Sequence, residues 1–168
     1  MLFSLEKKKE LLAKLADKNV VSDLGPYVGE LLWSEYPQIK LAHALSFPQS
    51  TNTVEFCQKS SLTEFDDLLA EISFTGYKVA SPGLGFTVPR VQVQIINEAF
   101  YALEENLATT TDMDQAMVSG LNYPEGPFKW CAEFGPSTVS LLLDNLHQTT
   151  GEPRYRQSVS LRLAAHKE

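Results

Sequence analysis

The residues that could do chemistry here are a histidine and, twelve positions later, a glutamate. His43 opens the segment HALSFPQSTNTVE and Glu55 closes it. An imidazole has a pKa near neutrality, so it can both accept and release a proton under ordinary conditions. A carboxylate bonded to the other ring nitrogen would fix the tautomer and stabilise the imidazolium. The spacing therefore predicts an acid–base pair, and the competing interpretation is a structural histidine on an apolar strand.

Two strands and their neighbours have to position this pair. Residues 39–47, which end before Pro48, and residues 52–58, with alternating Val54, Phe56 and Gln58, are predicted as strands. In the third predicted helix, Ser61 and Glu64 have the spacing of a capping box. The first part of the chain is predicted as a mixed α/β unit, with helices at 5–18, 27–36 and 60–73 and further strands at 19–24 and 76–81.

The pattern changes after residue 82. The turn PGLGF is followed by a helical period of apolar residues, with Pro89 in the first turn, where its missing N–H costs nothing. No strand is expected after Pro89. Helices are predicted at 89–108, 111–119, 126–134, 136–149 and 155–165. We therefore expect two domains, an α/β domain at 1–82 and a helical domain at 83–168.

Composition excludes several classes of function. The chain has 168 residues, a net charge of −7 and a pI near 5.0, which argues against binding to nucleic acid or to an anionic membrane. No apolar run is long enough to cross a bilayer, and the start lacks the pattern of a secretory signal. Cys57 and Cys131 are isolated and are expected as buried thiols in the cytoplasm. With so few Cys and His residues, no metal site is expected.

The helical half resembles the C-terminal domain of the 3-hydroxyacyl-CoA dehydrogenases. The resemblance rests on matches, in order, to the family patterns G-F-[IV]-x-N-R, N-E-A, D-[IV]-D-x-A-[MV] and G-x-G-[YF]-P-x-G-P-F. The matching residues are Gly85-Phe86, Arg90, Asn97-Glu98-Ala99, Asp112-Met113-Asp114, Ala116-Met117, Gly120 and Tyr123-Pro124-Glu125-Gly126-Pro127-Phe128. The resemblance implies a homodimer formed through this domain, which would also provide one wall of an acyl-CoA cleft.

The α/β half is similar to the second half of that family's dinucleotide-binding domain. The segment VVSDL stands where the family has Asn-Thr-Ser-Ser-Leu, which places Ser22 on a substrate-contacting serine. His43 falls on the catalytic histidine, and Glu55 falls on the glutamate that orients it. The resemblance implies a truncated Rossmann-like sheet of about four strands. It also implies NAD-linked oxidation of 3-hydroxyacyl-CoA to 3-ketoacyl-CoA, a reaction of fatty acid metabolism.

Several residues depart from the family pattern. Pro89 replaces the family's asparagine in G-F-[IV]-x-N-R, so that amide contact to substrate is lost. Ala44 to Phe47 replace the Phe-Phe-Asn-Pro that follows the family's histidine. The sequence holds no GxGxxG, because Val88 stands where Gly83-Leu84-Gly85 would need its third glycine. No cofactor-binding residue is therefore assigned.

Two functions remain open at this stage. One is an enzyme, inactive by itself, whose nucleotide-binding half comes from a partner chain; its base would be His43, oriented by Glu55. The other is a non-catalytic relative that serves as a dimerisation or acyl-CoA-binding module. The departures favour the second for the chain in isolation.

Overall fold

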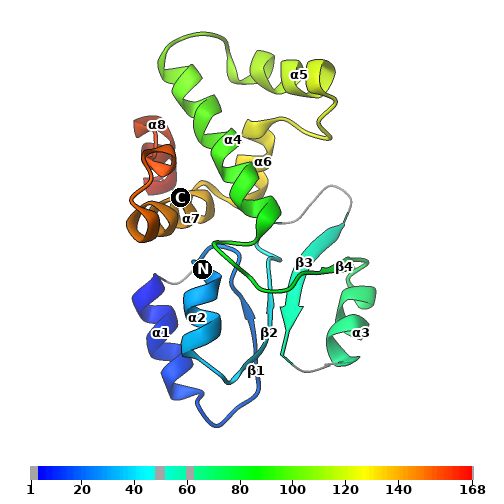
Figure 1. Cartoon of the computed structure of the whole chain (residues 1–168). Coiled ribbons are helices and arrows are strands. Elements are labelled where there is room, and N and C mark those ends of the chain that lie inside the picture. The colour runs from blue at the N-terminus through cyan, green and yellow to red at the C-terminus, as the bar shows by residue number, and fades with distance from the viewer. Residues whose placement is uncertain (1–3, 48–51, 60–62, 168) are drawn as a thin grey trace. The chain divides into compact units, whose positions relative to one another are not determined.

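The computed structural model describes residues 4–47, 52–59 and 63–167 (Figure 1). The chain divides into two compact units, Met1–Pro89 and Arg90–Glu168. The first holds a mixed sheet with its helices and the second is helical, so the predicted combination of a truncated Rossmann-like sheet with a helical domain is confirmed.

The sheet has four strands in the order β1-β2-β3-β4. They are β1 (Val20–Asp23), β2 (Ile39–His43), β3 (Thr53–Gln58) and β4 (Thr75–Lys78). β1 and β2 are parallel, β2 and β3 antiparallel, and β3 and β4 parallel. β2 is shorter than the predicted 39–47, because a turn closed by the Phe47 N–H on the Ala44 carbonyl (3.0 Å) follows it. His43 is therefore the last residue of its strand.

Helices cover both faces of this sheet. Figure 1 shows α1 (Leu5–Lys14) and α2 (Gly29–Glu35) together on one side and α3 (Thr63–Glu71) on the other. Leu12 of α1 and Leu32 of α2 are fully buried. The first helix ends at Lys14, four residues before the end of the predicted range 5–18. Ser61 of the predicted capping box lies outside the described residues.

Alternation along the strands sorts their side chains between the two faces. A buried apolar cluster lies on the α3 face and consists of Leu41, Val54, Phe56, Phe65 and Leu69. His43 is paired directly with Phe56 across the β2–β3 ladder, so its side chain belongs to the same face. This assignment decides the environment of the histidine.

The second unit contains the helices predicted for it. They are α4 (Thr87–Glu104, which begins in the first unit), α5 (Thr110–Leu121), α6 (Pro127–Phe134), α7 (Pro136–Thr150) and α8 (Val159–His166), with a 3-10 turn at Pro153–Tyr155. Among the described residues after Pro89 there is no strand, as predicted. Its core is apolar and includes Val93, Ile96, Val139, Leu142, Leu143, Leu146 and Leu161.

Two motifs of this unit turn out to hold helix ends in place. The Asp114 carboxylate of α5 accepts hydrogen bonds from the backbone N–H groups of Phe128 (2.8 Å) and Lys129 (3.1 Å), in the first turn of α6. An anion at a helix N-terminus satisfies unpaired donors and opposes the dipole. Gly126 precedes that turn so closely that a Cβ atom there would collide with Asp114. The segments DMD (112–114) and EGPF (125–128) thus act together to cap the N-terminus of α6.

Asn97 ties the C-terminal segment to α4. It is fully buried; its amide donates to the Arg156 carbonyl (2.9 Å) and accepts from the Ser158 N–H (2.9 Å). Removing a buried amide that is bonded on both sides costs more than the net worth of its two bonds, because the backbone groups would be left unpaired. The Asn97 of the N-E-A motif therefore holds the PRYR segment in place.

Candidate functional site

The candidate site lies at one edge of the sheet, where β1 and β2 end and β3 begins. Parallel strands bring their carboxyl ends to the same edge, and Asp23 pairs directly with His43 there. The Ala44 N–H donates to the Glu55 carbonyl (3.1 Å), so β3 brings Glu55 to the same edge. The three predicted residues, Ser22, His43 and Glu55, are thus close along the sheet, yet their side chains divide between its faces.

His43 lies in an apolar and partly enclosed environment. Its ring stacks on Phe65 with 5.8 Å between centroids, and its side chain is 13% exposed. Nδ1 accepts a hydrogen bond from the Leu45 N–H (3.3 Å), which leaves the proton of the neutral ring on Nε2. Burial lowers the pKa of His43, Asp23 raises it, and Lys8 lowers it. The net direction is downward, so the neutral ring is favoured.

Glu55 is occupied elsewhere. Its side chain is 4% exposed, and Oε2 accepts hydrogen bonds from the backbone N–H groups of Thr87 (3.0 Å) and Val88 (2.9 Å). Both donors belong to the first turn of α4, so Glu55 caps that helix. Glu55 adjoins Phe56, the partner of His43, and so points to the opposite face. Between the described positions of His43 and Glu55 there is no hydrogen bond; the predicted catalytic roles of both stay predictions.

Ser22 is buried and lies on the other face from His43. It pairs with Ala42, one residue before His43, and so shares a face with Ala42. Its predicted contact with substrate remains a prediction.

The residue that sequence reasoning missed is Asp23. Its Oδ2 lies 3.7 Å from His43 Nδ1, closer to the ring than any other carboxylate among the described ion pairs. The only signal in the sequence was its place directly after Ser22, at a position where the family pattern has a second serine. An acidic residue at a strand end is common on protein surfaces, which is why this signal was weak.

The turn Gly83-Leu84-Gly85 does not fit the pyrophosphate of NAD. A phosphate loop offers free backbone N–H groups at the start of the following helix. Here the helix that follows is α4, and the N–H groups of Thr87 and Val88 already bind the Glu55 carboxylate. The Glu55 carboxylate would repel a second anion at this point. The first turn of α4 is therefore already taken by a carboxylate of this chain.

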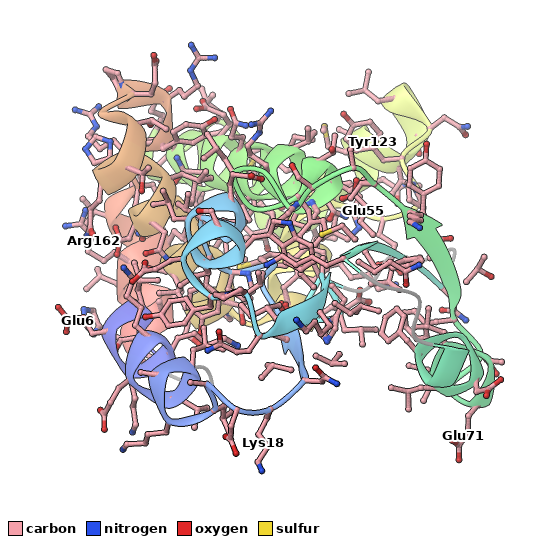
Figure 2. All side chains as sticks on the ribbon, turned by 60° about the horizontal axis from the view of Figure 1, so that its bottom comes forward. Glu6, Lys18, Glu55, Glu71, Tyr123 and Arg162 are labelled. Atoms are coloured by element: carbon pink, nitrogen blue, oxygen red, sulfur yellow. The ribbon has the colours of Figure 1, made fainter. Side chains whose placement is uncertain are left out.

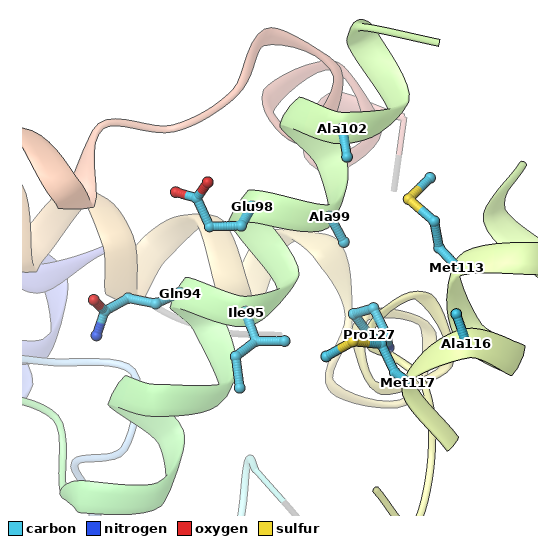
Figure 3. Close-up of a pocket in the computed structure, with 9 residues that line it drawn as sticks. All are labelled: Gln94, Ile95, Glu98, Ala99, Ala102, Met113, Ala116, Met117 and Pro127. Atoms are coloured by element: carbon cyan, nitrogen blue, oxygen red, sulfur yellow. The ribbon is translucent and has the colours of Figure 1, made fainter. Parts of the chain in front are cut away.

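A groove runs between α4 and α5 in the second unit (Figure 3). Its volume is about 440 Å³, and its lining is apolar apart from Gln94 and Glu98. The other lining residues are Ile95, Ala99, Ala102, Met113, Ala116, Met117 and Pro127. α5 buries none of its residues, and Val118 and Leu121 are 37% and 60% exposed. The helix thus presents apolar side chains that its own chain leaves uncovered.

Within the described ranges, no three His, Cys, Asp or Glu side chains gather as a metal site would require. None of the helices in those ranges has the length and apolar character that a bilayer crossing demands. Cys57 and Cys131 are both buried and form no disulfide, and burial raises the pKa of the Cys57 thiol to about 12.

Comparison with known proteins identifies what the chain resembles. Residues 85–168 match the model of the 3-hydroxyacyl-CoA dehydrogenase C-terminal domain. The 3-hydroxyadipyl-CoA dehydrogenase of Escherichia coli strain K12 is 43% identical over 81 residues, which are 48% of this chain and 17% of that protein. The mitochondrial hydroxyacyl-coenzyme A dehydrogenase of Homo sapiens is 29% identical over 137 residues, covering 80% of this chain and 41% of the human one.

The solved structures agree with the fold. The crystal structure of 3-hydroxybutyryl-CoA dehydrogenase from Escherichia coli K12 superposes with a TM-score of 0.69 at 26% identity, over 88% of this chain and 32% of that one. This likeness reaches beyond the helical half and includes the sheet. The chain spans less than half the length of the curated relatives it matches.

Proposed function

Because this chain belongs to the 3-hydroxyacyl-CoA dehydrogenase family, we propose that it is an acyl-CoA-binding, dimer-forming member that does not transfer hydride by itself. The observation that carries the proposal is the position of Glu55. A carboxylate that caps α4 is not free to orient His43, and the same contact closes the helix N-terminus nearest the glycine turn. The absence of a GxGxxG from the sequence supports the same conclusion.

The ligand would be an acyl-CoA, because the names of the relatives give CoA thioesters as the ligands of those proteins. Its place in fatty acid metabolism is part of this proposal. Ser22 and His43 lie at the edge where parallel strands of such sheets place their ligand-binding residues. The two cysteines are buried and form no disulfide, which is compatible with a reducing compartment, and we place the chain in the cytoplasm as part of this proposal.

The proposed dimer would form on the α4–α5 groove. The groove is apolar and open to solvent, and a partner that covers it would remove this apolar surface from water. The residues that line it are small or flexible, with three alanines and two methionines. Such a lining allows a helix of a second copy to approach closely. Covering α5 would bury side chains that the single chain leaves exposed.

Isothermal titration with acetoacetyl-CoA tests the proposal. Binding is expected, with a loss of affinity in Ser22→Ala if the hydroxyl holds a ligand oxygen, while NADH alone gives no heat of binding. Lys18→Ala, at an exposed position of the first unit, serves as the matched control and should bind as the wild type. Tight NADH binding, or no acetoacetyl-CoA binding at any accessible concentration, would contradict the proposal.

A second function is favoured by one observation: His43 retains an acidic neighbour in Asp23. This chain would then be the substrate-binding part of an active enzyme, with NAD bound by residues supplied from another chain. Mixing with a chain that carries a GxGxxG would restore NADH oxidation under this alternative, and would leave the rate at background under the first.

A further inference from the structure

At the ends of β1 and β2, the Asp23 carboxylate lies beside His43, at a position where the family pattern has a serine. Asp23 and His43 are the last residues of two parallel, paired strands, and they share one face of the sheet. The Leu24 N–H donates to the His43 carbonyl (2.9 Å), which continues the ladder past both residues. The backbone thus fixes the separation of the two side chains.

The Asp23 carboxylate is held by three hydrogen bonds. Oδ1 accepts from the Gly25 N–H (2.8 Å) and from the Ser46 hydroxyl (3.2 Å). Oδ2, the oxygen nearest His43, accepts from the Ser46 N–H (2.7 Å). These bonds join the loop after β1 to the loop after β2, so the carboxylate cannot turn away from the imidazole without breaking them.

The ring of His43 has two different nitrogens. Nδ1 accepts from the Leu45 N–H in the neutral form, while Nε2 has no hydrogen bond to any residue in 4–47, 52–59 or 63–167. Protonation puts a hydrogen on Nδ1, which then opposes the Leu45 N–H instead of accepting from it. The nearest acceptor for the new N–H is Asp23 Oδ2, 3.7 Å away.

We propose that Asp23, and not Glu55, is the positioning residue of His43: it accepts a hydrogen bond from the Nδ1–H of the imidazolium and leaves Nε2–H to donate to a carbonyl oxygen of the ligand. The inference rests on the proposed function for the nature of that ligand. The exchange of a proton between His43 and solvent is balanced, because Asp23 accepts a hydrogen bond and does not itself take up the proton.

The charges around the ring are few. Asp23 on β1 favours the imidazolium, and Lys8 on α1 opposes it. The Lys8 amine donates to the Asp23 carbonyl oxygen (3.1 Å) and lies 5.3 Å from the centre of the Tyr27 ring. From β3 and α3 the ring meets the apolar side chains of Phe56 and Phe65. Asp23 is therefore the group whose removal should affect His43 most directly.

Histidine ¹⁵N–¹H correlation spectra recorded across pH test this inference without any ligand. The three histidines are assigned with His43→Gln as the reference. In Asp23→Asn the pKa of His43 is expected to fall below the wild-type value, and in Lys8→Gln to rise above it. Ser46→Ala removes one of the bonds to the carboxylate and keeps its charge, so it should leave the pKa of His43 in place.

A wild-type measurement covers the case in which Asp23→Asn does not fold. The ¹³Cγ resonance of Asp23 is expected to show an inflection at the pKa of His43, because the two groups share a hydrogen bond after protonation. Two results would overturn the inference. One is a folded Asp23→Asn variant in which the pKa of His43 equals the wild-type value. The other is an Asp23 ¹³Cγ shift that does not change as His43 titrates. Failure of acetoacetyl-CoA to bind would instead refute the proposed function and leave this coupling standing.

Discussion

At the scale of single residues, His43 is stabilised in its neutral form. Burial against Phe65 lowers the pKa of His43 more than Asp23 raises it. A charged ring is costly in such surroundings because it loses water without gaining a full ion pair. The Leu45 N–H, which needs an acceptor at Nδ1, adds to the preference.

The pH dependence of stability follows from this preference. The unfolded chain binds a proton on His43 more readily than the folded chain, since the folded pKa is depressed. The contribution of His43 is thus complete above its unfolded pKa of about 6.5 and is lost as pH falls towards the folded value. Thermal unfolding between pH 8 and 5 should show a smaller loss of Tm in His43→Gln than in wild type. Parallel curves would refute this account of the ring.

At this scale the sequence allowed His43 and Glu55 to be chosen, but not their partners. Residue types and spacing carry information on chemistry, whereas a contact depends on which face of a strand each side chain occupies. The register that pairs His43 with Phe56 sends Glu55 to the other face. Register is set by packing of the whole sheet, and a family pattern transfers it only where the surrounding residues are also kept.

At the scale of elements, the first turn of α4, which belongs to the first unit, is bound by a side chain of the sheet. Its first turn receives the Glu55 carboxylate on the N–H groups of Thr87 and Val88. Pro89 follows in the same turn and lacks an N–H, so it requires no partner there. Glu55 is thus a structural residue in the described chain, whatever further role it has.

Glu55→Ala should lower the free energy of unfolding by about 2 kcal/mol, because two backbone donors lose a charged acceptor inside the protein. Glu55→Gln keeps an oxygen where Oε2 lies and should cost about half as much or less. Chemical denaturation of the three proteins measures this series. Equal stability of the alanine variant and wild type would show that the cap contributes nothing.

Two glycines near the Asp114 cap of α6 should respond in opposite ways to replacement by alanine, because only Gly126 lies against Asp114. Gly126→Ala places a Cβ atom against Asp114 and should destabilise the protein by about 2 kcal/mol through overpacking. Gly120→Ala has free space around it within α5 and should stabilise by about 0.5–1 kcal/mol, since alanine favours the helix. Urea unfolding of both variants compares them directly. Destabilisation by the alanine at 120 equal to that at 126 would contradict this explanation.

The order and type of the helices and strands were predictable, and their ends were less so. Apolar periods of 3.6 and 2 indicated the helices and strands, because burial of one face decides both. The strand ending at His43 was predicted four residues too long, since the turn at Ala44–Phe47 continues an apolar pattern without the strand geometry. The hydrogen bond between Asp114 and Phe128 joins residues fourteen positions apart, so a pattern of neighbouring residues could not predict it.

At the scale of the whole molecule, the apolar groove between α4 and α5 is the surface on which we propose that a second copy of the chain binds. Ala99→Arg would place a charge in the α4–α5 groove and is expected to convert the proposed dimer to a monomer with the fold intact. Gln148→Arg adds the same charge at an exposed position of α7 and should leave the dimer unaffected. Light scattering after size exclusion reports the mass of each. A monomeric wild type, or a dimeric Ala99→Arg, would contradict the proposed interface.

The central claim is that this family member handles acyl-CoA but does not transfer hydride alone. The most direct test is oxidation of NADH by the purified chain with acetoacetyl-CoA, followed at the nicotinamide absorbance, beside His43→Ala. We predict no rate above that of the variant, because Glu55 is engaged on α4 and not on His43. Turnover that disappears on replacing His43 would contradict the claim and mean that the chain forms a complete active site.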